Sequence, residues 1–301
     1  MRLSKSLGLL RLTGMLLLGL CRPANAFDYS LSGFGSIGFA INDQPIAYLR
    51  HIDDSGTFRS DSLLGLQLEA RLTPQFSATV QMVASAARDK DTGAEAAFRW
   101  AFLSYRLTDE WLVRVGRLRP PVLLNSQAGE VGVTYDQARL PVEVYSLSPV
   151  YDVDGAAVTK VWSTDTVEYG LDGYLGNTRI KFRDPRTLDS LYTKSRGAYI
   201  PERIRLTGIV LSVATESATL KLGMHRVNVW PYGNRPARDE LFQIPVPGAP
   251  PVGGTLFVPG NIIQQVDINV VTLGGDWRFG NWRMLAEYGE RDVRDSTIGI
   301  G

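Results

Sequence analysis

Polar and apolar residues alternate one by one along most of the chain, and this period of two predicts β-strands. The first alternating run extends from Phe27 to about Ile41. Ten further runs follow, at about residues 57–72, 76–85, 98–107, 111–118, 154–162, 166–176, 204–214, 218–230, 267–279 and 282–291. The pattern therefore predicts roughly eleven antiparallel strands.

Short and long connections take turns between these runs. Tight turns such as Thr73-Pro74-Gln75 and Gly280-Asn281 alternate with long segments at about residues 42–56, 86–97, 119–153, 177–203 and 231–266. Short turns at one end of the strands and long loops at the other are typical of bacterial outer-membrane barrels. The fold class is therefore predicted to be all-β, an antiparallel transmembrane β-barrel.

Each expected strand has one apolar face. In the second run, Leu64, Leu66 and Leu68 share a face opposite polar residues. Such alternation suits a barrel with hydrocarbon outside and water inside, because a closed barrel satisfies every backbone group in lipid. In the run 98–107, the odd-numbered residues, Arg99 included, are expected to face outward. A soluble periplasmic β-protein would alternate in the opposite sense, and that alternative stays open.

The first 26 residues have the three parts of a secretory signal peptide. Arg2 and Lys5 precede an apolar stretch from Leu12 to Cys21, and Ala24-Asn25-Ala26 gives the cleavage site. We expect cleavage after Ala26 and export to the outer membrane of a Gram-negative cell. The domains expected are a signal peptide over 1–26 and a β-barrel domain over 27–301.

Composition removes several classes of protein. The chain is 44% hydrophobic with near-balanced charge, which argues against disorder and against a basic nucleic-acid-binding domain. Removal of 1–26 deletes four of the 32 basic residues and none of the 31 acidic ones, leaving 28 against 31. The single cysteine, Cys21, lies in the expected signal peptide, so the mature chain is expected to contain no disulfide.

Residues 98–145 carry a resemblance to a known family, and a further short segment follows them. "RWAFLSYRLTDEWLVRVGRLRPP", "LPVEVYSLSP" and "DGAAVTK" resemble an uncharacterised, general-porin-like group of Gram-negative outer-membrane porins. The resemblance implies a homotrimeric diffusion porin whose complete barrel has about 16 strands and whose third external loop narrows the pore. Members of this group end in an aromatic residue, whereas this chain ends "DVRDSTIGIG", so we expect the C-terminal strands to be missing.

The candidate pore-lining residues are charged. The third long connection, 119–153, is the expected constricting loop, and opposite charges facing across a constriction set up a field that selects among solutes. Its candidates are Arg119, Glu130, Asp136, Arg139 and Glu143, with Arg59, Arg71 and Arg114 on the expected wall. The alternative for each residue is an ordinary solvated charge.

Catalytic and metal-binding signals are weak. The only histidines are His51 and His225, and neither a nucleophile elbow nor a phosphate loop occurs. We expect no enzyme activity, cofactor or metal, and no nucleic-acid partner. The expected function is passive diffusion of small hydrophilic solutes and ions, with a surface receptor or enzyme barrel as an alternative. The basic segment 177–203 is expected to contact lipopolysaccharide phosphates, and lipid to surround the barrel.

Overall fold

The computed structural model describes residues 28–43, 51–148, 150, 152–184, 198–231 and 263–297. Its strands are β1 (Asp28–Ser36), β2 (Leu63–Arg71), β3 (Phe76–Ala86), β4 (Ala94–Arg106), β5 (Trp111–Leu118), β6 (Val153–Ser163), β7 (Glu168–Asp184), β8 (Ala198–Ala214), β9 (Ala218–Pro231), β10 (Ile263–Phe279) and β11 (Trp282–Thr297). The predicted all-β fold with eleven antiparallel strands is confirmed. The predicted signal peptide and residues 232–262 lie outside the described residues.

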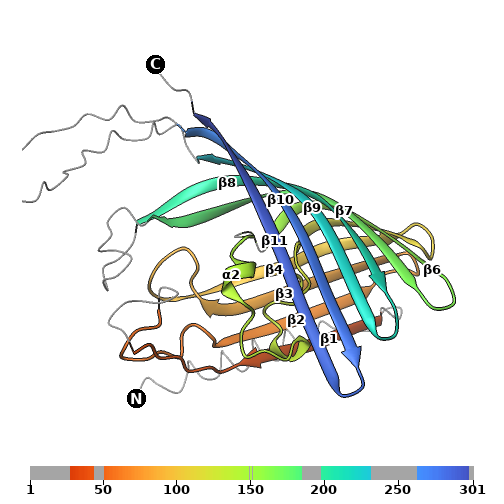
Figure 1. The fold of residues 1–301 in the computed structure, drawn as a ribbon, viewed down its shortest axis with the longest axis horizontal. Helices are drawn as coiled ribbons and strands as arrows, with labels where there is room; N and C mark the ends of the chain where they lie inside the picture. The colour runs from red at the N-terminus through yellow and green to blue at the C-terminus, as the bar shows by residue number, and fades with distance from the viewer. Residues whose placement is uncertain are drawn as a thin grey trace, which may run out of the picture.

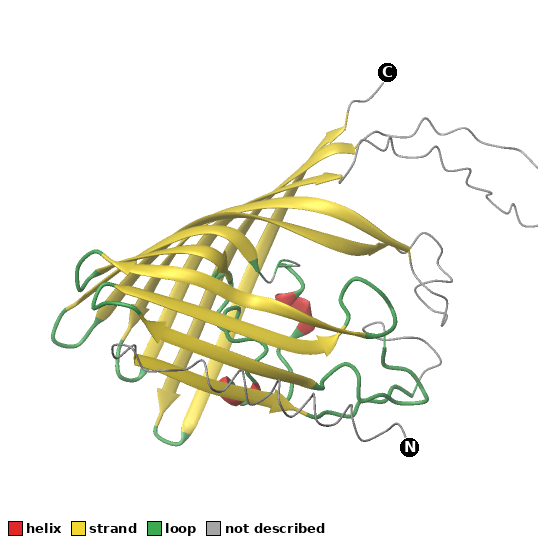
Figure 2. Cartoon of the chain, turned by 180° about the vertical axis from the view of Figure 1, so that it is seen from behind, coloured by secondary structure: helices red, strands yellow, loops and turns green. Residues whose placement is uncertain are grey.

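The strands form one sheet in chain order, from β1 at one edge to β11 at the other. The sheet curves strongly without closing, and the connection between β5 and β6 lies inside the curve (Figures 1 and 2). This connection contains a 3-10 turn, η1 (Gly132–Thr134), and a four-residue helix, α2 (Val142–Tyr145). Within the described residues, no helix is long and apolar enough to cross a membrane.

Several predicted strand bounds were wrong. β1 ends at Ser36 and β2 begins only at Leu63, so part of each predicted run is irregular connection. β7 and β8 are longer than predicted, with 17 residues each, and they pair with each other from Glu168↔Ala214 to Asp184↔Ala198. These extensions are rich in charged residues and were therefore predicted as a loop. A strand outside a hydrophobic environment needs no apolar face, so charged residues can pair in a sheet there.

A β-bulge in β4 corrects the predicted direction of Arg99. Gln81 pairs with Trp100 and Met82 pairs with Phe98, so Arg99 has no opposite residue. One extra residue reverses the alternation on the two sides of a bulge. Arg99 is therefore buried at 4% exposure, although Leu103, which was assigned to the same face, is 56% exposed as predicted.

The two faces of the sheet differ in polarity. We call the face that contacts residues 119–152 the inner face and the opposite face the outer face. Exposed apolar side chains cover the outer face of every strand, which in a soluble protein would be an unusually large apolar patch. They include Leu64, Leu66, Leu68, Met82, Leu103, Val115, Leu175, Leu211, Leu222, Met224, Leu273 and Met284.

Aromatic side chains gather on the outer face at the end of the sheet that carries the short turns. Phe76 stacks on Tyr105 with ring centroids 4.5 Å apart, and Trp162 stacks on Tyr169 at 5.6 Å. The ammonium of Lys160 lies over the ring of Trp111, 5.2 Å from its centroid. A belt of aromatic rings and a long basic side chain is the arrangement found where a barrel meets a lipid–water interface.

Candidate pore constriction

Residues 119–152, which we call loop L3, cross the inner face of the sheet. The predicted constricting loop, 119–153, is thus one residue shorter, because β6 begins at Val153. A loop of this length is uncommon unless it is functional or packed by its own contacts. Apolar residues of L3, including Val122, Leu123 and Val150, are buried together with Ile204 and Leu206 of β8. L3 therefore shares a hydrophobic core with the sheet.

A buried ion cluster fixes the first half of L3. Glu130 forms ion pairs with Arg119 of L3, with Arg88 of the β3–β4 connection and with Arg99 of the bulge. The Arg99 Nε lies 3.3 Å from Glu130 Oε1. The side chains of Arg119, Arg99 and Glu130 are only 1%, 5% and 10% exposed. Charge-assisted bonds of this kind are strong where water is excluded.

The charge balance of the cluster shifts two carboxyl groups in opposite directions. Burial alone would raise the pKa of Glu130, but the charges of Arg119, Arg88 and Arg99 outweigh it and lower that pKa below its ordinary value. Burial raises the pKa of Asp152, and Arg99 and Arg117, at 3.8 and 3.9 Å, oppose this only in part. The arginines thus favour the ionised form of Glu130, whereas burial disfavours the ionised form of Asp152.

Two segments of L3, around Leu124 and Tyr145, are attached to β9 and β11. The Leu124 N–H donates to Glu287 Oε1 of β11 at 2.6 Å, and the Tyr145 hydroxyl donates to the same oxygen at 3.3 Å. Tyr145 also accepts the N–H of Asn125 at 3.0 Å. Lys221 Nζ of β9 donates to the Leu124 carbonyl oxygen at 3.4 Å. One carboxylate thus ties two segments of the loop to the wall.

A chain of hydrogen bonds through three strands supports the same segment. The Thr272 hydroxyl donates to the Val122 carbonyl oxygen at 2.8 Å, so its oxygen accepts the Nε2–H of His225 at 3.1 Å. His225 Nδ1 is then the acceptor for the Tyr174 hydroxyl, 2.6 Å away. A Cβ at Gly208 would lie 2.5 Å from that hydroxyl oxygen, so only glycine leaves room for the chain. His225 is thus a structural residue held in one tautomer.

Two further ion pairs hold L3 at its exposed side. Arg283 Nη1 of β11 lies 2.6 Å from Asp136. Arg139 pairs with Asp61, which precedes β2, and its Nε donates to Asp61 Oδ1 at 3.0 Å. Asp136 is 76% exposed, so screening by solvent weakens the first pair. L3 therefore contacts the sheet near both of its edges, just before β2 and at β11.

The structure brings together some of the predicted residues. Arg119 and Glu130 are in direct contact in the ion cluster, and Arg114 lies beside the start of L3, where its Nη2 donates to Thr159 at 2.8 Å and lies 3.5 Å from Asp172. This contact differs from the predicted arrangement, in which charges of opposite sign face each other across open water. A direct ion pair anchors the loop instead of setting up a field across a gap.

The remaining predicted residues lie elsewhere. Glu143 is exposed in the first turn of α2. Arg59 is in the connection before β2, not on a strand, and its guanidinium donates to the Gly93 carbonyl oxygen. Arg71 is at the short-turn end of β2, 70% exposed and 3.9 Å from Asp28. The described ion pairs of Glu130 include neither Arg59 nor Arg71.

Sequence reasoning missed most of the residues that hold L3, and five of them show why. Arg88 lies in a connection, Arg99 was assigned outward, and Asp152, Thr272 and Glu287 had been given no role in the site. Thr272 and Glu287 occupy polar positions of the alternating runs 267–279 and 282–291, and this was the available signal for them. Within the described residues, no group of three or more histidine, cysteine or acidic side chains could hold a metal ion.

Comparisons with known proteins give fold likeness alone. No protein-family model and no curated protein matches the sequence. The outer-membrane expressed OmpT of Vibrio cholerae is 9% identical over 90% of this chain and 80% of its own, with a TM-score of 0.38. The anion-selective porin from Comamonas acidovorans is 11% identical over 89% and 80%, with a TM-score of 0.33. Likeness at this level carries no argument about solute or mechanism.

Proposed function

We propose that this chain forms the wall and the constricting loop of an outer-membrane pore for passive diffusion of small hydrophilic solutes and ions. In this proposal the outer face contacts hydrocarbon, the inner face lines water, and the long connections lie at the cell exterior. Passive diffusion of this kind involves no chemical reaction. The homotrimer implied by the family resemblance stays a prediction.

The anchoring of L3 supports this proposal most strongly. The loop lies on the inner, polar face of the sheet, and its contacts reach from Asp61 before β2 to Glu287 in β11. A loop held across the inside of a curved sheet narrows whatever space that sheet encloses. Polar residues on the inner face and apolar residues on the outer face have the sense of alternation expected for a water-filled membrane barrel.

Membrane insertion sets one physical requirement. β1 and β11 each pair with one strand in the described sheet, and an unpaired strand edge is strongly unfavourable in hydrocarbon. The proposed pore therefore requires hydrogen-bond partners for the free edges of β1 and β11.

Planar bilayer recordings of the full chain test the proposal. We expect discrete conductance steps, and we expect Glu130→Gln to increase open-channel noise because L3 loses its central anion. Glu168→Gln, at the exposed start of β7, is the matched control and should behave as the wild type. Protein with native β-sheet content that gives no conductance would contradict the proposal. Recovery in the periplasmic supernatant would instead favour a soluble protein.

A further inference from the structure

Two glycines of the inner face lie where L3 comes closest to the sheet. A Cβ at Gly274 of β10 would be 2.6 Å from Leu124 Cγ of L3, and a Cβ at Gly289 of β11 would overlap Leu147 Cδ1. Neither glycine has a positive φ, so the backbone alone does not require glycine at these places. A glycine inside a strand often marks a place where another segment approaches closely. We call Gly274 and Gly289 the glycine seat of L3.

Side chains on either side of Gly274 hold the backbone of Leu124. Lys221 of β9 and Glu287 of β11 lie directly opposite Gly274 on the two neighbouring strands. Glu287 accepts the Leu124 N–H at 2.6 Å, and Lys221 donates to the Leu124 carbonyl oxygen at 3.4 Å. The backbone of Leu124 is thus held from both sides while its side chain lies on Gly274. Three residues in one line across the sheet therefore determine where Leu124 lies.

The next inward-facing line of residues makes the second contact with L3. Thr272 of β10 lies opposite Gly289, and its hydroxyl donates to the Val122 carbonyl oxygen at 2.8 Å. Leu147, which follows α2, lies over Gly289. Two segments of L3 that are distant in sequence, around Leu124 and around Leu147, thus lie against adjoining parts of β10 and β11.

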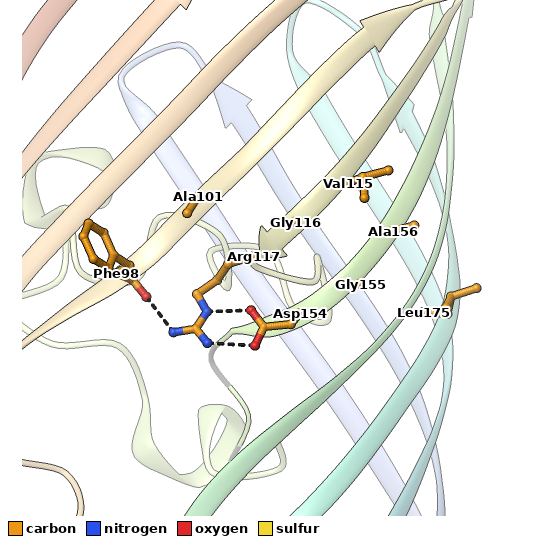
Figure 3. Close-up of a pocket in the computed structure, with 9 residues that line it drawn as sticks. All are labelled: Phe98, Ala101, Val115, Gly116, Arg117, Asp154, Gly155, Ala156 and Leu175. Atoms are coloured by element: carbon orange, nitrogen blue, oxygen red, sulfur yellow. Dashed lines mark hydrogen bonds and ion pairs between the residues drawn. The ribbon is translucent and has the colours of Figure 1, made fainter.

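The two ends of L3 are attached to the sheet by an ion pair. Arg117 of β5 lies opposite Asp154 of β6, and two hydrogen bonds of 2.8 Å join their side chains (Figure 3). Arg117 is two residues before L3 and Asp154 is two residues after it. Because this pair holds the ends, a larger side chain in the glycine seat displaces the middle of L3 instead of the whole loop.

We propose that Gly274 and Gly289 set the size limit of the pore, because they determine how closely L3 lies to the wall. This inference rests on the proposed function, in which L3 narrows the channel. With a Cβ at Gly274, Leu124 must retreat by at least 0.8 Å, the difference between 2.6 Å and the 3.4 Å at which ordinary contact begins. L3 lies inside the curve of the sheet, so this retreat moves it into the enclosed space.

Gly274 is the stricter of the two positions. Both methyl groups of Leu124 also face the added Cβ, at 3.1 and 3.2 Å, so rotation of that side chain relieves little of the overlap. At Gly289 the overlapping atom is a terminal methyl of Leu147, and the Cγ behind it is 3.7 Å away. Rotation of Leu147 therefore relieves more of the overlap, and we expect a smaller effect at Gly289 than at Gly274.

Single-channel recordings of the full chain in planar bilayers test this inference. Gly274→Ala should have a lower conductance than the wild type, and Gly274→Val a lower one still, because each larger side chain moves L3 further into the enclosed space. Liposome swelling with arabinose, glucose and sucrose measures the size limit, and the rate for sucrose should fall most. Gly173→Ala is the matched control, because Gly173 is inside β7 and a Cβ there meets nothing within 4 Å.

A second substitution in L3 separates loop displacement from general damage to the strand. Gly274→Ala/Leu124→Ala removes the overlapping side chain and should restore the wild-type conductance. Gly274→Ala/Leu147→Ala leaves the overlap in place and should not restore it, because residues in contact are coupled whereas separated residues act additively. If the Gly274 variants do not fold, Gly289→Ala with and without Leu147→Ala gives the same comparison.

Unchanged or higher conductance in the folded glycine variants would overturn the inference. Equal restoration by Leu124→Ala and Leu147→Ala, or restoration by neither, would do the same. Circular dichroism measures folding separately. A wild-type chain that conducts, with glycine variants that conduct equally well, contradicts only the role of the glycine seat. A folded wild-type chain that gives no conductance contradicts the proposed function itself.

Discussion

At the scale of single residues, Glu130 is a buried carboxylate on which the position of L3 depends. It is almost fully buried and contacts three arginines from three parts of the chain. Removing one partner of a buried ion cluster leaves the others without compensation, which destabilises proteins more than loss of a surface pair. The ion cluster therefore couples the position of L3 to the β3–β4 connection and to the bulge within β4.

Glu130→Gln should lower the free energy of unfolding by about 3 kcal/mol, because the buried Arg99 and Arg119 and the partly exposed Arg88 lose their shared anion. The same residue gives a pH dependence. The pKa of Glu130 is lowered in the folded chain, so its stabilisation is present above the ordinary glutamate pKa and is lost as pH falls through the lowered value. Urea unfolding in lipid vesicles between pH 7 and pH 3 measures both effects. An identical pH profile for wild type and variant would contradict this role.

Thr272 joins L3 to the sheet through a single hydroxyl. Thr272→Val keeps the side-chain shape but leaves the Val122 carbonyl oxygen and His225 Nε2 without this partner, at a cost of about 1–3 kcal/mol. We expect faster proteolysis of L3 in the variant. Thr207→Val on the outer face is the control and should change neither stability nor cleavage. Wild-type cleavage rates in Thr272→Val would show that this bond does not hold the loop.

At the scale of elements, alternation was sufficient to find every strand, because each contains a run in which apolar residues share one face. Alternation could not locate the bulge at Arg99. Both faces of this strand contain arginine and aromatic residues, so an extra residue does not change the pattern detectably. It also missed the extensions of β7 and β8, where the sequence is polar. The site was predictable as a loop, but its partners were not, because they depend on contacts between distant segments.

Backbone conformation at Gly116 determines how closely β4 and β5 approach. Its φ of +134° is unfavourable for other residues, and a Cβ there would lie 2.3 Å from the Ala101 carbonyl oxygen. Gly116→Ala should lower the free energy of unfolding by about 2–4 kcal/mol. Gly132→Ala is the matched control, because a Cβ at Gly132 meets nothing within 4 Å. Thermal unfolding in detergent compares the two, and equal midpoints would contradict the strain at Gly116.

At the scale of the whole molecule, the proposed pore requires the outer face of the sheet to contact lipid. Leu211 and Ser212 are neighbours on β8 with opposite directions, and Leu211 is 41% exposed on the outer face. Leu211→Arg should destabilise the inserted protein by about 2–4 kcal/mol, because a charge then faces hydrocarbon. Ser212→Arg should have a much smaller effect, since an inner-face charge reaches water. Unfolding from lipid vesicles gives both values, and equal losses would show that the faces do not differ.

Whether the outer face contacts hydrocarbon is tested most directly by a nitroxide scan along β2 from Leu66 to Arg71 in lipid vesicles. Each label is measured for collisions with oxygen, which concentrates in hydrocarbon, and with a water-soluble nickel complex. Labels at Leu66, Leu68 and Ala70 should be oxygen-accessible, and labels at Gln67, Glu69 and Arg71 should be nickel-accessible. Nickel accessibility at all six positions would contradict the membrane-spanning sheet.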